Sequence, residues 1–448
     1  MMLIKSMRRG LFFSVGILWI AQPASAIGLM QAYTAALQND PQYRSAVFDN
    51  QAGQEYKNLG LSALLPSAQF NYGSSKNKAE TTQPFNGRSV TTRPEYTSIN
   101  SGVTIRQTLF NLDATARYKQ GIAQADHSEA VFSSRAQDLM VRLVSAYADA
   151  KYGEDQFNLI KAQRDSYAEQ KRINDRMFEK GEGTITEMLE TQAKLDVAEA
   201  QLIESADNLT LSRNTLAEMI GQDVNNLDGL ANDFQPAPLA PASIEEWRTI
   251  ANEKNAEILA GRISLESAEY EVSRNKAGHA PRLDLTAGYN RSISDSLTTF
   301  NQDSTVRSIG VQLTIPLYSG GYVNSSVRQA VANREKARSD LNATTSRVII
   351  ELRKQFSTVQ SSVAKILALQ KSVKSSTSLV EATQQSVKGG VRINVDVLNA
   401  QQQLVLAKRD LAQARYNYLI SMIKLRVAAG TLNIDDLQTV ASYFSPAN

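Results

Sequence analysis

The chain has 448 residues, of which 42% are hydrophobic, 21% are charged and 7% are aromatic. It contains no cysteine and two histidines, His127 and His279, which excludes disulfide scaffolds and thiolate metal sites and leaves little for zinc binding or imidazole catalysis. The net charge of +3 comes from Lys5, Arg8 and Arg9, so the rest of the chain is balanced and nothing argues for a nucleic-acid partner.

Residues 1–26 have the features of a secretory signal peptide. A basic start is followed by a mostly apolar stretch, Leu11 to Ile20, and by the small-residue cleavage site Ala24-Ser25-Ala26. The apolar stretch is too short to cross a hydrocarbon core ~30 Å thick, which argues against a transmembrane anchor. Beyond it no apolar stretch reaches ~18 residues, so membrane entry would require β-structure or other copies of the chain.

The remaining chain consists of two similar halves. Pairs such as Gly181 with Gly390, Leu195 with Leu404 and Gly221 with Gly430 are each 209 positions apart. This period is far too long for a solenoid and indicates a duplicated half-molecule. The expected division is a first repeat over 27–235, a proline-rich linker over 236–242, a second repeat over 243–432 and a C-terminal segment over 433–448.

Each half is expected to contain the same elements in the same order. Two long proline-free tracts, from Pro94 to Pro236 and from Pro316 to Pro446, are free to form helices. The first half predicts a helix over 28–61, strands over 66–74 and 98–111, a long helix over 113–180 and a helix over 186–220. The second predicts a helix over 243–278, strands over 282–290 and 306–317, a long helix over 322–388 and a helix over 394–429. The stretches 74–97 and 291–304 are expected to be polar loops.

The four predicted strands alternate between apolar and polar residues, as strands of a sheet with two unlike faces do. In the second half Leu283, Leu285, Ala287 and Tyr289 face one way. Four strands cannot close a barrel, whose known minimum is about eight. The strands are therefore either two ordinary hairpins on a soluble core or part of a sheet pooled between copies. The great length of the helices favours pooling, and hence a homo-oligomer.

The predicted long helices would each extend about 100 Å at 1.5 Å per residue. The helix after each long one carries a strict heptad repeat, with Met188, Leu195, Leu202, Leu209 and Leu216 in the first half. A second ladder of small residues follows three positions later, and includes Ala198 and Ser205. A period of 3.5 favours a left-handed coiled coil with close helix approach. The alternative is an exposed amphipathic helix of a globular core.

These features resemble the TolC family of outer-membrane channel-tunnels. The resemblance covers the whole chain after the signal peptide, and its most specific motifs are AGHAPRLDL, IPLYSGGYVNSSVRQA, GGVRINVDVLNAQQQL and LAQARYNYL. The segment GEGTITEMLE at 181–190 is similar to the branch that exports proteases or lipases by type I secretion.

The resemblance implies a mainly helical fold with a β-barrel part. Three copies would each give four strands to a twelve-stranded barrel in the outer membrane, and their helices would form an α-barrel that extends into the periplasm. The 222–242 connection and the C-terminal segment would form a girdle. The implied partners are a periplasmic adaptor, an inner-membrane ABC transporter or other energised pump, and outer-membrane lipid.

The expected function is passive export of proteins, with no catalytic residue, cofactor or metal. Two alternatives remain open at this point. One is the outer-membrane component of a multidrug efflux pump, and the other is a periplasmic coiled-coil structural protein that never enters a membrane.

The resemblance also implies a gate at the turns between long and short helices. By this resemblance, Arg392 matches an arginine that ties the closed tip together in the family. Asp396 matches the first of two acidic residues that ring the aperture. Asn399 occupies the place of the second acid, which halves the expected acidic rings. Glu187 falls where the first half carries the acidic partner of the arginine.

Four glycines in the same turns are expected to contact the adaptor. They are Gly181, Gly183, Gly389 and Gly390.

Overall fold

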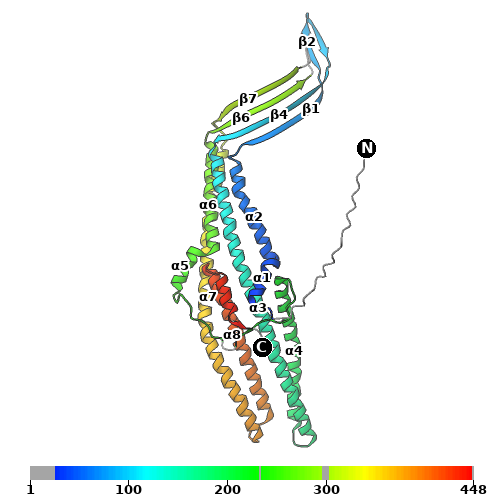
Figure 1. Cartoon of the computed structure of the whole chain (residues 1–448), viewed down its shortest axis with the longest axis vertical. Helices are drawn as coiled ribbons and strands as arrows, with labels where there is room; N and C mark the ends of the chain where they lie inside the picture. The colour runs from blue at the N-terminus through cyan, green and yellow to red at the C-terminus, as the bar shows by residue number, and fades with distance from the viewer. Residues whose placement is uncertain (1–25, 232–233, 295–301, 446–448) are drawn as a thin grey trace, which may run out of the picture.

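The computed structural model describes residues 26–231, 234–294 and 302–445, so almost all of the predicted signal peptide lies outside the described residues. The molecule is strongly elongated (Figure 1). A curved sheet lies at one end, long helices run along the axis, and two helical hairpins end in separate turns at the other end. The helices are α1 Leu29–Asn39, α2 Pro41–Ser62, α3 Leu112–Glu179, α4 Ile185–Ile220, α5 Ile244–Lys254, α6 Ala256–Lys276, α7 Tyr322–Lys388, α8 Asn394–Ala429 and α9 Ile434–Ala441.

The long helices lie close to their predicted positions. α3 has 68 residues and α7 has 67, and each is followed by a 36-residue helix. Asn111 caps α3 by accepting hydrogen bonds from the backbone amides of Asp113 and Ala114. Gly221 and Gly430 end α4 and α8 in the left-handed conformation, which glycine adopts without a steric penalty.

The prediction of one continuous helix at the start of each half was wrong. The helix expected over 28–61 is broken at Asp40, whose side chain accepts a hydrogen bond from the amide of Tyr43 and caps α2. Pro41 occupies the first turn of α2, where its missing amide costs nothing. The helix expected over 243–278 is broken in the same way at Asn255, which caps α6. A short 3-10 turn, Ala277–His279, follows α6.

The main sheet contains four antiparallel strands in the order β1-β4-β6-β7. Their bounds are β1 Ser67–Lys78, β4 Glu95–Phe110, β6 Arg282–Ser294 and β7 Gln302–Thr314. β7 ends at Thr314, three residues earlier than predicted, because Pro316 cannot donate to a strand ladder. In the described part of the chain, β1 and β7 each pair on one side only, so both edges of the sheet are free.

The prediction of a polar loop over 74–97 was also wrong, because most of these residues form β-strands. β1 and β4 extend into it, and a separate hairpin, β2 Thr81–Phe85 with β3 Arg88–Thr92, continues beyond them. Asn86 and Gly87 form its turn with φ of 51° and 76°. An Asn-Gly pair at the turn between two short strands is a strong hairpin signal. The other expected loop, 291–304, is shorter than predicted, because β6 extends to Ser294 and β7 begins at Gln302. Residues 295–301 lie outside the described residues.

The two faces of the sheet differ in chemistry. The strand pairing places Phe70 opposite Val103, Val103 opposite Tyr289, and Leu285 opposite Val311, so these apolar side chains share one face. The other face carries the intervening residues, including Arg106 and Asp284, whose side chains approach to 3.8 Å. On the apolar face Ile309 is 79% exposed and Val311 61% exposed, and no described part of the chain covers them.

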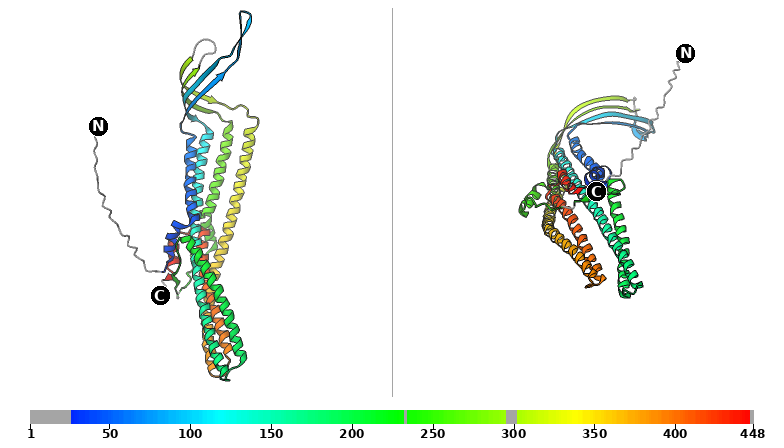
Figure 2. Two further views of the ribbon diagram at one scale, coloured as in Figure 1. Left: turned by 90° about the vertical axis from the view of Figure 1, so that its right-hand side faces the viewer. Right: turned by 60° about the horizontal axis from the view of Figure 1, so that its bottom comes forward.

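The helices continue the order of the strands. α2, α3, α6 and α7 lie side by side in one curved layer, in the order in which their strands β1, β4, β6 and β7 lie in the sheet (Figure 2). Like the sheet, this layer has two free edges, and both carry exposed apolar side chains. On α2 Phe48 is 59% and Leu59 62% exposed, and on α7 Ile350 is 67% exposed.

Below this layer the chain forms two coiled helix pairs, α3 with α4 and α7 with α8. The predicted heptad positions face the partner helix, because Leu195, Leu209 and Leu216 are buried on α4. The small-residue ladder is buried beside them, with Ala198 1% and Ser205 3% exposed. Small side chains at every second seam position let the paired helices approach closely.

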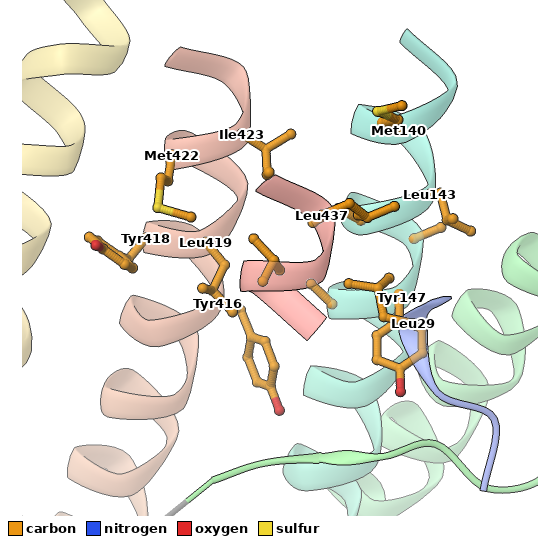
Figure 3. Packing of buried hydrophobic residues seen from close by; sticks show 14 of the residues in the cluster. Leu29, Met140, Leu143, Tyr147, Tyr416, Tyr418, Leu419, Met422, Ile423 and Leu437 are labelled. Atoms are coloured by element: carbon orange, nitrogen blue, oxygen red, sulfur yellow. The ribbon is translucent and has the colours of Figure 1, made fainter. Parts of the chain in front are cut away.

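The largest apolar core lies midway along the molecule. α9 lies between α3 and α8 (Figure 3). Its Leu437 belongs to the same buried apolar cluster as Tyr147 of α3 and Leu419 of α8. The short strand β5, Gly229–Leu230, pairs with β8, Phe444–Ser445, and Ile27 forms a bridge to Leu227. These contacts gather the chain start, the segment after α4 and the C-terminal segment at one level. Across 26–231, 234–294 and 302–445, every helix lacks the combination of length and apolar character that crossing a membrane requires.

Candidate gate at the helix tips

The two turns at the end remote from the sheet have nearly the same backbone structure. In the first, the amides of Glu182 and Gly183 donate to the carbonyl of Met177 at 2.8 and 3.1 Å. In the second, the amide of Val391 donates to the carbonyl of Ser386 at 2.9 Å. The turns lie apart in the single chain, one below α3 and α4 and the other below α7 and α8 (Figure 1).

The four glycines predicted to contact an adaptor differ in their structural need for glycine. Gly181 and Gly390 have φ of 77° and 72°, a region that other residues rarely adopt. A Cβ atom at Gly183 would lie 3.1 Å from the backbone nitrogen of Phe178, so the turn there is tight. Gly389 has an ordinary φ of −80° and no atom closer than 3.6 Å to the position of a Cβ. The turn itself accounts for three of these glycines.

Glu187 caps its own helix. Its carboxylate accepts hydrogen bonds from the backbone amide and the hydroxyl of Thr184, at 3.2 and 3.1 Å. The hydroxyl of Thr184 in turn accepts from the amide of Glu187 at 3.2 Å, which completes a capping box. Within the described residues Glu187 forms no ion pair, so the structure does not bring it together with Arg392 in one chain.

Arg392 and Asp396 lie at the start of α8. Arg392 is exposed, and its side chain has no hydrogen bond or ion pair within the described ranges. Asp396 is half-buried in the first turn of α8, where a negative charge interacts favourably with the helix dipole. Among the described residues, neither Arg392 nor Asp396 forms an ion pair.

Asn399, which replaces the expected second acid, is bound by a lysine from the other helical hairpin. The ammonium group of Lys194 on α4 donates to the Asn399 carbonyl oxygen at 2.8 Å and to Gln402 Oε1 at 3.4 Å. A neutral acceptor suits this role, because it ties α8 to α4 without adding another negative charge beside Asp396.

Asn174 joins α3, α4 and α8 at the same level, and no sequence pattern predicted this role. Its side chain is buried on α3 and donates to Thr191 Oγ1 on α4 at 2.8 Å. Its carbonyl oxygen accepts a hydrogen bond from the Asn394 amide of α8 at 2.7 Å and one from Gln170 at 3.1 Å. Further from the tip, Ser166 donates to Gln401 at 3.1 Å.

Near the tip, the contact between the α3–α4 pair and α8 thus combines two neutral hydrogen bonds with two from the Lys194 ammonium group, beside a small apolar patch. That patch contains Tyr167, Leu195, Ala198 and Leu398. Burial raises the pKa of the Tyr167 phenol despite a hydrogen bond from Gln163, so this hydroxyl stays neutral. Each neutral hydrogen bond contributes about 0.5–1.5 kcal/mol, a strength that permits reversible separation.

Replacing Asn174 with alanine is expected to loosen the start of α8, because the Asn394 amide loses its buried acceptor. The loss of such a partner costs about 1–3 kcal/mol, which corresponds to about a ten-fold or greater increase in local opening. Trypsin cleavage after Arg392 measures that opening. Asn58→Ala is the control, since Asn58 binds only Glu55 on the same helix. Equal cleavage rates in the two variants would show that Asn174 does not hold the tip.

Comparison with known proteins identifies the family. The sequence matches the family described as "Outer membrane efflux protein" over residues 32–222 and 247–431. It is 39% identical over 434 residues to the alkaline protease secretion protein AprF of Pseudomonas aeruginosa, and the match covers 96% of this chain and 90% of that protein. It is 28% identical over 433 residues to the outer membrane protein TolC of Vibrio cholerae, which covers 96% of this chain and 97% of that protein.

The fold has close counterparts among solved structures. The CmeC outer membrane channel of Campylobacter jejuni is similar with a TM-score of 0.78 at 17% identity, covering 99% of this chain and 98% of that one. This similarity confirms the predicted mainly helical fold with a β-sheet part, and the family match confirms the expected outer-membrane location. The chain belongs to the outer membrane efflux protein family, as its resemblance to TolC indicated.

Proposed function

We propose that three copies of the chain form the outer-membrane channel of a tripartite export system that secretes proteins such as proteases or lipases. The channel is a passive conduit across the outer membrane and the periplasm. An inner-membrane ABC transporter or other energised pump supplies the energy, and a periplasmic adaptor connects the pump to the turns at the helix tips.

The open sheet is the observation that carries this proposal. Because its four strands alternate in direction, β7 of one copy runs antiparallel to β1 of the next, and a ring of copies closes without a mismatch. Two free edges in an exported protein would otherwise expose unpaired backbone groups. We take the number of copies as three, and the number of strands as twelve, from the resemblance to the TolC family.

The faces of the sheet fit such a barrel. Side chains such as Phe70 and Ile309 would contact lipid, and the face with Arg106 and Asp284 would line a water-filled lumen. This distribution disfavours a periplasmic coiled-coil protein, because that protein would expose the apolar face to water. The four-helix layer, whose free edges coincide with those of the sheet, would close with it.

The likeness to a protein named for alkaline protease secretion supports protein cargo over small molecules. A strain that lacks the gene is expected to lose one or more proteins from its culture medium and to recover them when the gene is restored. The comparison is made by mass spectrometry of the medium, alongside the minimum inhibitory concentrations of several drugs. Unchanged secretion with increased drug sensitivity would overturn the protein-secretion proposal in favour of efflux.

A further inference from the structure

Basic side chains lie on the apolar face of the sheet, just beyond its apolar residues. The strand pairing places Lys76 opposite Thr97, Arg291 opposite Ser101 and Arg307 opposite Tyr289, which itself lies opposite Val103. Side chains alternate along a strand, so all three basic residues project from the face that carries Val103. Lys76 and Arg291 lie toward the ends of their strands remote from the helices, and Arg307 lies near the middle of β7.

These residues form a row because the strands lean across the long axis. A level line crosses β1 nearer its far end than it crosses β7 (Figure 1). For strands tilted by about 35–45°, such a line shifts by about one to one and a half residues per strand, and the nearest residue of the same face is two positions along. The pairing register relates each basic residue to a position on β4. Lys76 corresponds to position 97, Arg291 to 101 and Arg307, through Tyr289, to 103, so the register shifts by two residues per strand. The position between them, 99, is Ile99 of β4 itself.

Two members of the row have no acidic partner in the part of the chain that the structure describes. Arg291 pairs with Asp303 at 2.6 Å, whereas Lys76 and Arg307 form no ion pair within the described residues. The guanidinium of Arg307 lies 5.7 Å from the centre of the Tyr289 ring, a cation–π contact that holds it on the apolar face. On the helix side of the row, this face carries no charged residue as far as Leu283 and Leu313.

The row therefore has the chemistry of a boundary between hydrocarbon and anionic headgroups. An uncharged apolar band ends in the aromatic residue Tyr289, and cations without an ion pair among the described residues lie beside or beyond it. In a barrel of three copies β7 adjoins β1 of the next copy, so Arg307 and Lys76 of adjacent copies come to neighbouring strands. Each Lys or Arg near an anionic membrane surface contributes about 1 kcal/mol to binding.

We propose that Lys76 and Arg307 bind the phosphate groups of a phosphorylated lipid in the leaflet remote from the periplasm. This inference rests on the proposed trimeric barrel, which determines the leaflet and brings the two residues together. The occupant is a lipid because the cations continue an apolar face that only acyl chains would cover. Diphosphoryl lipid A is the probe, and the same lipid without its phosphates is the matched comparison.

The test uses the full-length protein purified in a nonionic detergent, with bound lipids counted by native mass spectrometry. Trimers are expected to bind diphosphoryl lipid A at least about ten-fold more tightly than the dephosphorylated form, since two charges act at each site. The double variant Lys76→Gln/Arg307→Gln is expected to lose most of this preference. The charge-conserving variant Lys76→Arg/Arg307→Lys should keep it, which shows that charge is what matters.

Lys57→Gln/Lys161→Gln is the control, because it removes two exposed charges from α2 and α3 and leaves the sheet unchanged. Trimers without a phosphate preference, or a Lys76→Gln/Arg307→Gln variant that retains it, would overturn the inference. The same spectra report the oligomer. Protein that is monomeric would contradict the proposed barrel itself, and this failure is distinct from that of the lipid site.

Discussion

Replacing Val311 with arginine is expected to abolish assembly of the protein in the outer membrane. Val311 lies in the middle of the apolar face, opposite Leu285, and is 61% exposed in the single chain. An arginine on the lipid face of a barrel costs about 2–4 kcal/mol at the midplane, and three copies would bear this cost together. Heat-modifiable trimers in outer-membrane extracts, detected by electrophoresis without boiling, measure the assembly.

The adjacent residue provides a matched control. Gln312→Arg introduces the same side chain one position along β7, on the face that carries Asp284, and lies opposite that carboxylate. This variant is expected to assemble normally, because its arginine would project into the lumen. Equal assembly of the two variants would contradict the assignment of the faces, and failure of the control alone would reverse it.

The sequence predicted the long elements far better than the short ones. The absence of proline over two long tracts and the heptads at Leu195, Leu209 and Leu216 are signals that extend over many residues, so α3, α4, α7 and α8 lie where expected. The errors fall at single residues. Asp40 and Asn255 each end one helix and cap the next, and a polar residue within an otherwise helical pattern does not by itself reveal that break.

The β-structure beyond position 78 was missed for a different reason. Residues 81–92 are polar and lack the alternation that indicates a half-buried strand, because their hairpin is exposed on both sides. Only the Asn86-Gly87 pair pointed to it. Alternation of apolar and polar residues arises when one face of a strand is buried, so a strand that is exposed on both faces need not show it.

The tip residues show a further limit. The role of Asn174 depends on the approach of α8, which begins 220 positions later, and no local pattern in α3 indicates that contact. Lys194 and Asn399 depend on the same approach. Arg392 and Asp396 could be identified only from the family motif, since they form no ion pair with any residue that the structure of one chain describes.

The absence of a partner for Arg392 and Asp396 leads to the second large effect. Each copy already holds its own two hairpins together through Asn174, Asn394, Lys194 and Asn399. In the proposed trimer, contacts between copies would close the remaining gaps around the axis. Three copies of Asp396 would also place like charges near one another, and a cation such as Arg392 of a neighbouring copy would offset this repulsion.

The double variant Arg392→Ser/Asp396→Ala is expected to raise single-channel conductance in planar bilayers several-fold. Single exposed ion pairs contribute only about 0–1 kcal/mol, but three equivalent contacts sum around the ring and their loss acts on all tips together. Lys336→Ser/Asp340→Ala is the matched control. It removes an exposed pair of opposite charges, 2.8 Å apart, from α7 and should leave conductance unchanged. A small, unaltered conductance in the Arg392 and Asp396 variant would mean that the hydrogen bonds within each copy are sufficient to keep the tip closed.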